Sequence, residues 1–219
     1  MGKKCSQKFH IISGAVYMEF QIKELLKEHR EAISQIKSVL DEGSFYLAGG
    51  TALYYILKHR NSIDLDFFTS ENIDLRKFND YFKAHELKLI SKDTIHAVVK
   101  GVNLSLFLFP YPLLKPLIEF HIIKIASLED ILCMKVNAVI RRGSKKDFID
   151  IYFIMKEMKL NSNILLELFQ RKFGKYNPLI IKKALTYFED AEKEPEIELI
   201  KKANWEDIKK FFIKEFGRI

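Results

Sequence analysis

The spacing of apolar residues divides the chain into a mixed first part and a helical second part. In residues 18–40 the apolar side chains recur at helical spacing, which predicts a helix. After them, short apolar runs separated by turn residues predict strands at 45–48, 62–68, 87–90, 94–100, 102–109 and 120–126. Helical spacing returns between them at 51–60 and 75–85, and the two prolines in 109–112 predict a loop.

From Ser127 onward the apolar residues recur only at helical spacing. Ser127, with Asp130 three residues later, resembles a helix-capping box, and Gly143 is positioned to end that helix. Ser144 can cap the next helix, over 145–159. Later helical patterns cover 165–174, 178–191 and 205–216, with 193–196 as the expected linker.

Together these patterns predict an α+β fold in two domains. Residues 18–126 are expected to form a mixed β-sheet flanked by helices, and residues 127–219 a C-terminal helical domain. The basic residues 1–17 are expected to be a poorly ordered lead.

Composition and charge narrow the function classes. The shares of hydrophobic (48%) and charged (30%) residues are ordinary for a soluble globular protein. No uncharged apolar run reaches about 18 residues, so neither a membrane span nor a membrane partner is expected. The two cysteines, Cys5 and Cys133, give no disulfide framework and fit a reducing cytoplasm. The net charge of +7 favours an anionic partner such as a nucleotide or RNA.

Gly49 and Gly50 lie between a predicted strand and a predicted helix. Glycines let the backbone approach a phosphate closely, and the helix that follows directs free N–H groups at it. Thr51 can add a hydroxyl. The spacing matches neither GxGxxG nor GxxxxGK[ST], which excludes dinucleotide-binding and P-loop motifs by pattern. For these glycines alone, a tight strand-to-helix turn without a ligand is an equal alternative.

Asp64 and Asp66 add a second feature in the next predicted strand. Residues i and i+2 of a strand face the same side, so these carboxylates project together, roughly 7 Å apart. Burying two like charges is unfavourable unless a cation joins them. A divalent ion such as Mg²⁺ or Mn²⁺ prefers oxygen ligands and commonly binds one or two carboxylates plus substrate phosphates. The alternatives are a solvated edge strand, or pairing with an arginine such as Arg60.

A second charged motif stands at the start of the helical part. Lys135 and Arg142 are seven residues apart and share a helix face, where two cations could bind a triphosphate. Asp147 and Asp150 are neighbours on the next helix. The alternative is purely structural: Asp147 stabilises the helix N-terminus, and Lys146 pairs with Asp150 at i,i+4.

Two blocks of this sequence resemble the AbiEii/AbiGii toxin family, within the nucleotidyltransferase superfamily related to DNA polymerase β. The first is LAGGTALYYILKHRNSIDLDFF, where GGT precedes Arg60, Ser62, Asp64 and Asp66 in an R-x-S-x-D-x-D pattern. The second is SLEDILCMKVNAVIRRGSKKDFIDIYFI, which holds a lysine, an arginine and a K-D-x-x-D run. Both blocks occur in the family's order, across residues 45–158.

The resemblance implies a nucleotidyltransferase fold, with helices added at the C-terminal side of a mixed sheet. It implies an enzyme that uses a divalent metal and an NTP. Some members are toxins that add nucleotides to tRNA 3′ ends, with a cognate antitoxin as a candidate partner. Carried over, Asp64 and Asp66 bind the metal, and Asp147 serves the chemistry. Nucleotide-binding roles then go to Gly49, Gly50, Thr51, Ser62, Lys135 and Arg142. The acceptor is expected to be an RNA 3′ hydroxyl, held by the basic segments 170–175 and 180–185.

The sequence departs from the superfamily pattern in one strand. A third carboxylate is expected on the strand at 102–109, which contains no acid and offers Ser105 as its one polar residue after Asn103. Either Asp147 or Asp150 supplies the missing group, or the protein is a catalytically impaired nucleotide- or RNA-binding module of the same fold.

Overall fold

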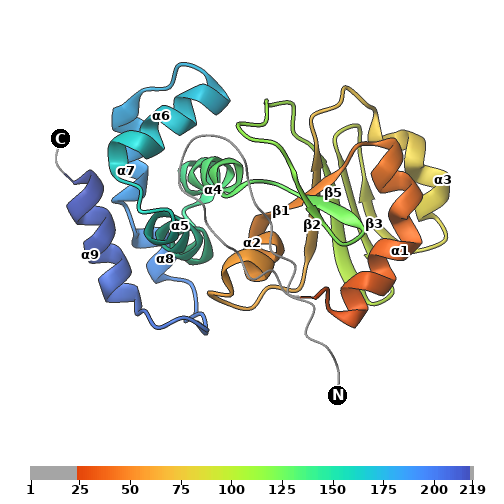
Figure 1. The fold of residues 1–219 in the computed structure, drawn as a ribbon, viewed down its shortest axis with the longest axis horizontal. Coiled ribbons are helices and arrows are strands. Elements are labelled where there is room, and N and C mark those ends of the chain that lie inside the picture. Colours follow the sequence, from red (N-terminus) through yellow and green to blue (C-terminus); the bar gives the residue numbers. More distant parts are fainter. Residues whose placement is uncertain (1–23, 218–219) are drawn as a thin grey trace.

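The computed structural model describes residues 24–217. The expected lead at 1–17 and the first residues of the predicted helix at 18–40 lie outside the described residues. A sheet with its covering helices forms one end of the molecule, and a helical layer forms the other (Figure 1). The predicted fold class, a mixed sheet flanked by helices and followed by a helical part, is confirmed. The division into two domains stays a prediction.

Within residues 24–217, seven strands form one mixed sheet in the order β3-β4-β5-β2-β1-β7-β6. β2 runs antiparallel to β1 and parallel to β5, and β1 runs parallel to β7. Their bounds are β1 Tyr46–Ala48, β2 Leu65–Thr69, β3 Glu86–Ile90, β4 Thr94–Val99, β5 Val102–Leu108, β6 Ile118–Phe120 and β7 Ile123–Ile125. Because β2 is central, its side chains have neighbours from strands on both sides.

The two faces of β2 differ because strand side chains alternate in direction. Leu65 and Phe67 are fully buried on one face. On that side of the molecule α1 (Lys27–Glu42) packs its apolar stripe against β5. Asp66 and Phe68 are on the opposite face and are only partly buried. This second face is the one that remains accessible to a ligand.

The turn after β1 leads directly into α2 (Gly49–Leu57). Lys58 adopts a left-handed conformation, with φ of 50°, and ends that helix. His59 and Arg60, which the sequence suggests as part of the helical C-terminus, therefore lie beyond the helix and are buried. Further along, the helical pattern at 75–85 forms a 3₁₀ turn (Leu75–Phe78) followed by the short helix α3 (Asn79–Phe82).

Two helices form the centre of the helical part. α4 (Leu128–Arg142) and α5 (Lys145–Glu157) pack against each other and against α2, between the sheet and the outer helices (Figure 1). As predicted, Ser127 caps α4, and Gly143 ends it at φ of 59°. The outer helices are α6 (Ser162–Phe173), α7 (Pro178–Leu185), α8 (Glu189–Glu192) and α9 (Trp205–Phe216). No helix among the described residues is long and apolar enough to cross a bilayer.

Two predicted elements are each split in two. The run at 120–126, predicted as one strand, contributes to the hairpin of β6 and β7, with His121 at φ of 52° in its turn. The helix predicted over 178–191 breaks between α7 and α8. Thr186 ends α7, and its hydroxyl donates a hydrogen bond to the Lys182 carbonyl. Such short turns hardly change the spacing of apolar residues, so the sequence pattern does not reveal them.

A buried ion pair joins the helical part to the loop that precedes β6. Lys172 of α6 donates to the Asp130 carboxylate at 2.6 Å and to the Pro112 carbonyl at 2.9 Å. Asp130 also accepts a hydrogen bond from the Leu114 N–H at 2.9 Å. Both charged side chains are fully buried, so each depends on the other for compensation.

Replacing Lys172 by methionine is expected to lower the free energy of unfolding by about 3–5 kcal/mol, because the Asp130 carboxylate would stay buried without its cation. The neighbouring Arg171 is exposed, so Arg171→Met is the matched control and should change stability by less than about 0.5 kcal/mol. Urea unfolding followed by circular dichroism gives both values. Equal unfolding midpoints for the two variants would contradict a structural role for the pair.

Candidate active site

A cleft of about 710 Å³ opens between the sheet and helices α4 and α5. This volume is typical of small-molecule and cofactor sites. Nine site residues are predicted from the sequence. Those that line the cleft are Gly49, Gly50, Ser62, Asp64, Asp66, Lys135, Arg142 and Asp147. The fold thus brings the two sequence blocks together at one place.

The glycine turn at the start of α2 has no room for side chains. Gly49 has φ of +71°, and a Cβ there would lie 3.2 Å from Oδ2 of Asp66. At Gly50 a Cβ would lie 2.7 Å from Oγ of Ser62 and 2.9 Å from Nη2 of Arg60. No side chain caps the helix at this end, so its first N–H groups can bind an anion. The turn therefore has the backbone geometry that the sequence predicts for phosphate binding.

Thr51 is the one predicted site residue that does not line the cleft. Its side chain is buried, and its hydroxyl donates to the Asp64 carbonyl oxygen at 2.5 Å. The same hydroxyl lies 3.0 Å from Oγ of Ser62. Thr51 thus supports the loop that carries Ser62 and Asp64, and its hydroxyl is engaged inside the protein.

Asp64 and Asp66 lie at the mouth and on the floor of the cleft. Asp64 is exposed, just before β2, and accepts a hydrogen bond from Nδ2 of Asn103 at 3.1 Å. Burial raises the pKa of Asp66, and the nearby Asp64 charge adds to that rise. Lys135 and the Ser105 hydroxyl act in the opposite direction on this pKa. Asp66 is therefore a carboxylate whose charge is incompletely compensated by the protein.

This pair fits a divalent cation through its donor chemistry. The two side chains offer only oxygen atoms, and their like charges would be neutralised by a shared ion. Among the described residues no larger group of His, Cys, Asp and Glu side chains is arranged to hold a metal. The remaining ligands would then come from water and substrate phosphates, as is usual for Mg²⁺.

Ser105 occupies the place opposite Asp66 on the neighbouring strand. β5 runs parallel to β2 and pairs Ser105 with Asp66. On the far side of Ser105, β4 contributes His96, whose Nδ1 lies 3.0 Å from the Ser105 Oγ. A row of polar side chains thus crosses three strands without the third carboxylate of the superfamily pattern.

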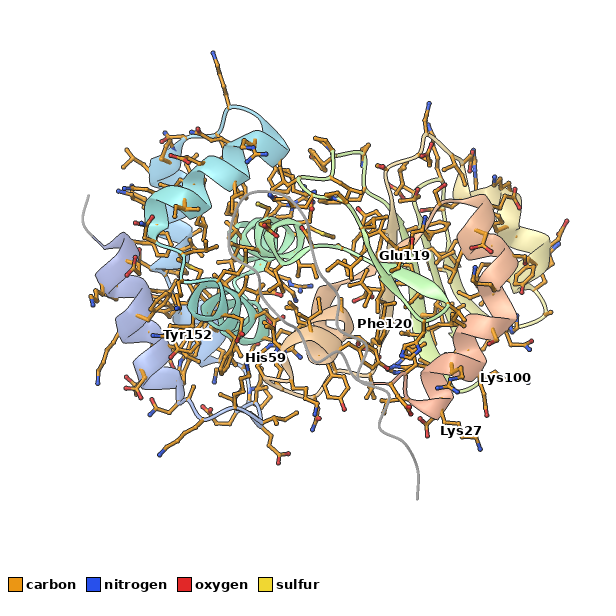
Figure 2. All side chains as sticks on the ribbon, in the orientation of Figure 1. Lys27, His59, Lys100, Glu119, Phe120 and Tyr152 are labelled. Atoms are coloured by element: carbon orange, nitrogen blue, oxygen red, sulfur yellow. The ribbon has the colours of Figure 1, made fainter. Side chains whose placement is uncertain are left out.

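Asp150 is fully buried at the junction of α2, α4 and α5, where it binds three basic side chains. Its carboxylate lies 2.6 Å from Nε2 of His59, 2.7 Å from both Nε and Nη2 of Arg60, and 2.6 Å from Nζ of Lys135. Figure 2 marks His59 at this junction. The structural alternative that pairs Asp150 with Lys146 is wrong, since Lys146 is exposed on the cleft instead.

The pKa values in this cluster reflect burial opposed by ion pairing. Burial alone would raise the pKa of Asp150, but Lys135, His59 and Arg60 together hold it well below its usual range. Burial would lower the pKa of Lys135, yet Asp150 and Asp147 raise it above its usual value. The pKa of His59 is lowered, with burial as the main cause. The carboxylate and the lysine therefore stay charged at neutral pH.

Asp147 receives hydrogen bonds from two cations of α4. Nζ of Lys135 donates to Oδ1 at 2.9 Å, and Nε of Arg142 donates to Oδ2 at 2.7 Å. The Asp147 side chain is fully buried, whereas the Arg142 side chain is 55% exposed. The assignment of Asp147 as a chemical participant stays a prediction. In this arrangement its carboxylate holds two cations in the same cleft as the glycine turn.

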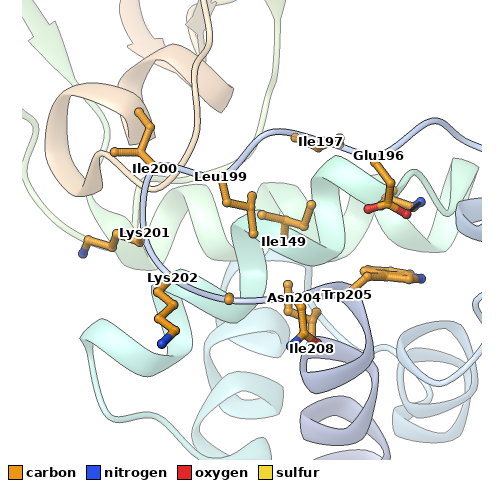
Figure 3. Close-up of a pocket in the computed structure, with 12 residues that line it drawn as sticks. Ile149, Glu196, Ile197, Leu199, Ile200, Lys201, Lys202, Asn204, Trp205 and Ile208 are labelled. Atoms are coloured by element: carbon orange, nitrogen blue, oxygen red, sulfur yellow. Dashed lines mark hydrogen bonds and ion pairs between the residues drawn. The ribbon is translucent and has the colours of Figure 1, made fainter.

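The segment between α8 and α9 holds the cluster from the outside. The carbonyl of His59 accepts a hydrogen bond from the Ile200 N–H at 2.8 Å, and Arg60 forms an isolated bridge with Leu199. Figure 3 shows this segment curving over a second hollow of about 360 Å³, with Ile149 and Trp205 in its lining. Glu196 is the one carboxylate that lines this hollow, so the paired acids are a feature of the larger cleft.

Sequence reasoning missed the contributions of His59, His96 and Asn103. His59 and Asn103 act through partners far along the chain, Asp150 and Asp64, which no local spacing reveals. His96 acts through Ser105, nine residues away, and only the pairing of β4 with β5 places the two side by side. His59 and Arg60 are adjacent in sequence, and both bind one acid. The one signal in the sequence is this basic pair at the end of a predicted helix. Basic residues are also common at a helix C-terminus, where they interact favourably with the helix dipole, so the pair does not point to a buried acid.

Replacing Asp150 by asparagine is expected to lower the free energy of unfolding by about 3–5 kcal/mol at pH 7, because Arg60 and Lys135 would lose their buried counter-charge. The partly exposed pair of Glu157 and Lys201 gives a control, with Glu157 on the same helix, and Glu157→Gln should cost at most about 1 kcal/mol. Since the native pKa of Asp150 is depressed, its stabilisation is complete above the unfolded value of about 4 and is lost as pH falls below it. Urea unfolding at pH 7 and pH 3 should therefore show the gap between variant and wild type narrowing in acid. A gap that is absent at pH 7 would contradict this role.

Comparison with known proteins identifies the family. A family model described as the nucleotidyl transferase AbiEii toxin of type IV toxin–antitoxin systems matches residues 31–105 and 109–217. An uncharacterized protein of Aquifex aeolicus (strain VF5) is 37% identical over 205 residues, which cover 89% of this chain and 98% of that protein.

Two solved structures share the fold. A Helicobacter pylori protein, provisionally described as a nucleotidyltransferase, has a TM-score of 0.50 at 20% identity, covering 87% of this chain and 95% of that one. MenT4, a nucleotidyltransferase toxin from Mycobacterium tuberculosis H37Rv, has a TM-score of 0.51 at 11% identity, covering 86% of this chain and 82% of that one. The family match includes both motif blocks and most of the chain. This chain therefore belongs to the AbiEii nucleotidyltransferase toxin family and is a nucleotidyltransferase.

Proposed function

We propose that this protein uses a divalent metal to transfer NMP from an NTP to the 3′ hydroxyl of an RNA, with a tRNA 3′ end as the first candidate acceptor. The observation that carries the proposal is the Asp64–Asp66 pair beside an uncapped helix N-terminus, at the edge of a nucleotide-sized cleft. Phosphate, metal and cationic groups would meet at this edge. Such a set suits phosphoryl-group transfer, where positioning and charge neutralisation provide most of the catalysis.

Each part of the cleft edge has a distinct role in this proposal. The free N–H groups of Gly50 and its neighbours would bind the terminal phosphates. Asp64 and Asp66 would hold Mg²⁺ or Mn²⁺, which when bound supplies charge stabilisation at the α-phosphate. The exposed Arg142 guanidinium would contact the triphosphate, while Lys135, buried behind it, adds fixed positive charge.

The acceptor hydroxyl must lose a proton, and Asp147, to which the family resemblance gives a role in the chemistry, is the candidate to accept it. Both Asp147 oxygens already accept hydrogen bonds from Lys135 or Arg142. That occupancy favours a positioning role, in which Asp147 orients the cations against the substrate. Proton transfer through Asp147 would require one of these contacts to loosen when substrate binds.

Positive charge near the cleft supports an RNA acceptor. Arg141 and Lys146 line the cleft, are exposed, and make no ion pair with the described residues. In the basic segment 170–175, Lys172 is buried against Asp130, so only the remaining cations are available for an RNA backbone. We further propose a cytoplasmic toxin role with a cognate antitoxin, which rests on the family alone.

The alternative function is a nucleotide- or RNA-binding module of the same fold with impaired catalysis. The observation that favours it is Ser105, which stands opposite Asp66 where an acid is expected. Retention of Asp64 and Asp66 favours the enzyme, because two close carboxylates without a metal would only reduce stability.

The aspartate pair is tested with Mg²⁺, total tRNA and each of the four labelled NTPs. Asp64→Asn and Asp66→Asn should each reduce label incorporation by about 10³-fold or more, because the metal's charge stabilisation is worth several kcal/mol. Asp80→Asn, an exposed change on α3, is the control and should leave incorporation unchanged.

Stability measurements keep this test independent of activity. Because the native pKa of Asp66 is raised, its ionised form reduces stability at neutral pH, and Asp66→Asn should melt at the same or a slightly higher temperature without metal. Mn²⁺ should raise the melting temperature of the wild type and have little effect on Asp66→Asn. Full activity of either asparagine variant, or unfolding of both, would contradict the proposed metal role.

Restoring the missing acid separates the two candidate functions. If the wild type is a working enzyme, its acceptor hydroxyl already loses its proton without an acid at position 105. Ser105→Asp should then change the transfer rate by less than about tenfold. If the wild type is impaired, the same variant should gain about 10²–10⁴-fold, the usual contribution of a general base. Ser105→Asn controls for side-chain size, and initial rates at saturating NTP give the comparison. We expect the first result, and a large gain limited to Ser105→Asp would favour the binding module.

A further inference from the structure

The cleft has a fixed order of chemical groups along the sheet. The glycine turn follows β1, and Ala48 of that strand pairs with Asp66 of β2. Two residues further along β2, Phe68 lies on the same face, roughly 7 Å beyond Asp66. Phe68 pairs with Tyr46 on one side and Phe107 on the other. The order from the turn is thus phosphate site, acidic pair and aromatic surface.

Three phenylalanines form this aromatic surface, which we call the aromatic wall: Phe68, Phe107 and Phe109. The Phe68 and Phe107 rings stack with centroids 5.1 Å apart and an interplanar angle of 28°. Phe109 meets Phe68 edge-on at 5.8 Å. All three line the cleft and are only partly buried. The wall therefore leaves aromatic area exposed inside a cleft whose other end is charged.

Apolar residues of α4 line the same cleft from its helical side. Met134 and Ala138 are four residues apart on α4, share one helix face and also line the cleft. Both are partly buried. A flat ring inserted here would have aromatic side chains on one side and aliphatic side chains on the other. Aromatic surface of this kind binds any nucleobase, because every base has a π-face.

We propose that the aromatic wall binds the base of the incoming NTP, which rests on the proposed function. The groups of an NTP follow the same order as the cleft, since the terminal phosphates, the α-phosphate with ribose, and the base come one after another. With phosphates on the glycine turn and the α-phosphate at Asp66, the base reaches the wall. Contact through ring faces tolerates different bases, so the wall contributes affinity for the nucleoside part more than choice among the four NTPs.

Binding of nucleotides and of inorganic tripolyphosphate tests this assignment. Titration calorimetry with Mg²⁺ would compare the wild type, Phe68→Leu and Phe107→Leu, because leucine keeps an apolar side chain and removes the ring. The ligands are the α,β-methylene analogues of ATP and CTP, tripolyphosphate, and a short single-stranded RNA. Phe173→Leu is the matched control, since Phe173 belongs to the same aromatic cluster, 6.1 Å from Phe109, and does not line the cleft.

The expected result is a loss of nucleotide affinity of about 5- to 150-fold in the two wall variants, the usual contribution of one stacked base. Their affinity for tripolyphosphate should stay within about twofold of the wild type, and Phe173→Leu should change neither. Unchanged nucleotide binding in both wall variants would overturn the proposal. Weaker RNA binding with unchanged nucleotide binding would also overturn it, because the wall would then belong to the acceptor site. An equal loss of affinity for nucleotides and for tripolyphosphate would overturn it as well. A wild type that binds neither nucleotide nor tripolyphosphate would instead refute the proposed function itself.

Discussion

The ion pairs of Asp150 are the constraint on which the geometry of the cleft depends. This one buried carboxylate binds His59 and Arg60 from the turn after α2, and Lys135 from α4. Arg60 in turn lies against Gly50, so the position of the glycine turn is linked to that of α4 and α5. Because each charge is buried, none can leave the cluster without a large energetic penalty. The cluster thereby fixes the distance between β2, which carries Asp66, and helices α4 and α5.

The same cluster accounts for the uneven charge compensation in the cleft. Lys135 is shared by Asp147 and Asp150, so it can offset only part of the negative charge on Asp66. Asp66 is left partly buried beside the like charge of Asp64, an arrangement that reduces stability without a cation. Unfavourable electrostatics at a cleft edge, with well-paired charges beneath it, is the pattern expected of a binding site. The charge distribution therefore points to the cleft edge at Asp64 and Asp66 as the place where a cation binds.

How much the sequence could reveal depends on whether a feature is local. The cap at Ser127, the end of α4 at Gly143 and the glycine turn follow from neighbouring residues, and the structure confirms each of them. Two of the three partners of Asp150, His59 and Arg60, could not be predicted, because they are about 90 residues away. For Asp150, the i,i+4 rule offered Lys146 as a plausible partner, and tertiary packing overrode it. Likewise, only strand pairing places Ser105 opposite Asp66.

The central claim is that Asp64 and Asp66 bind one end of a metal–nucleotide complex in this cleft. A crystal structure with Mn²⁺ and a non-hydrolysable NTP analogue tests it most directly, since anomalous scattering locates the ion. The account predicts an anomalous peak between the two carboxylates, with the terminal phosphates at the N–H groups of Gly49 and Gly50. A nucleotide bound with its phosphates away from this turn, or an ion without contact to either aspartate, would contradict it.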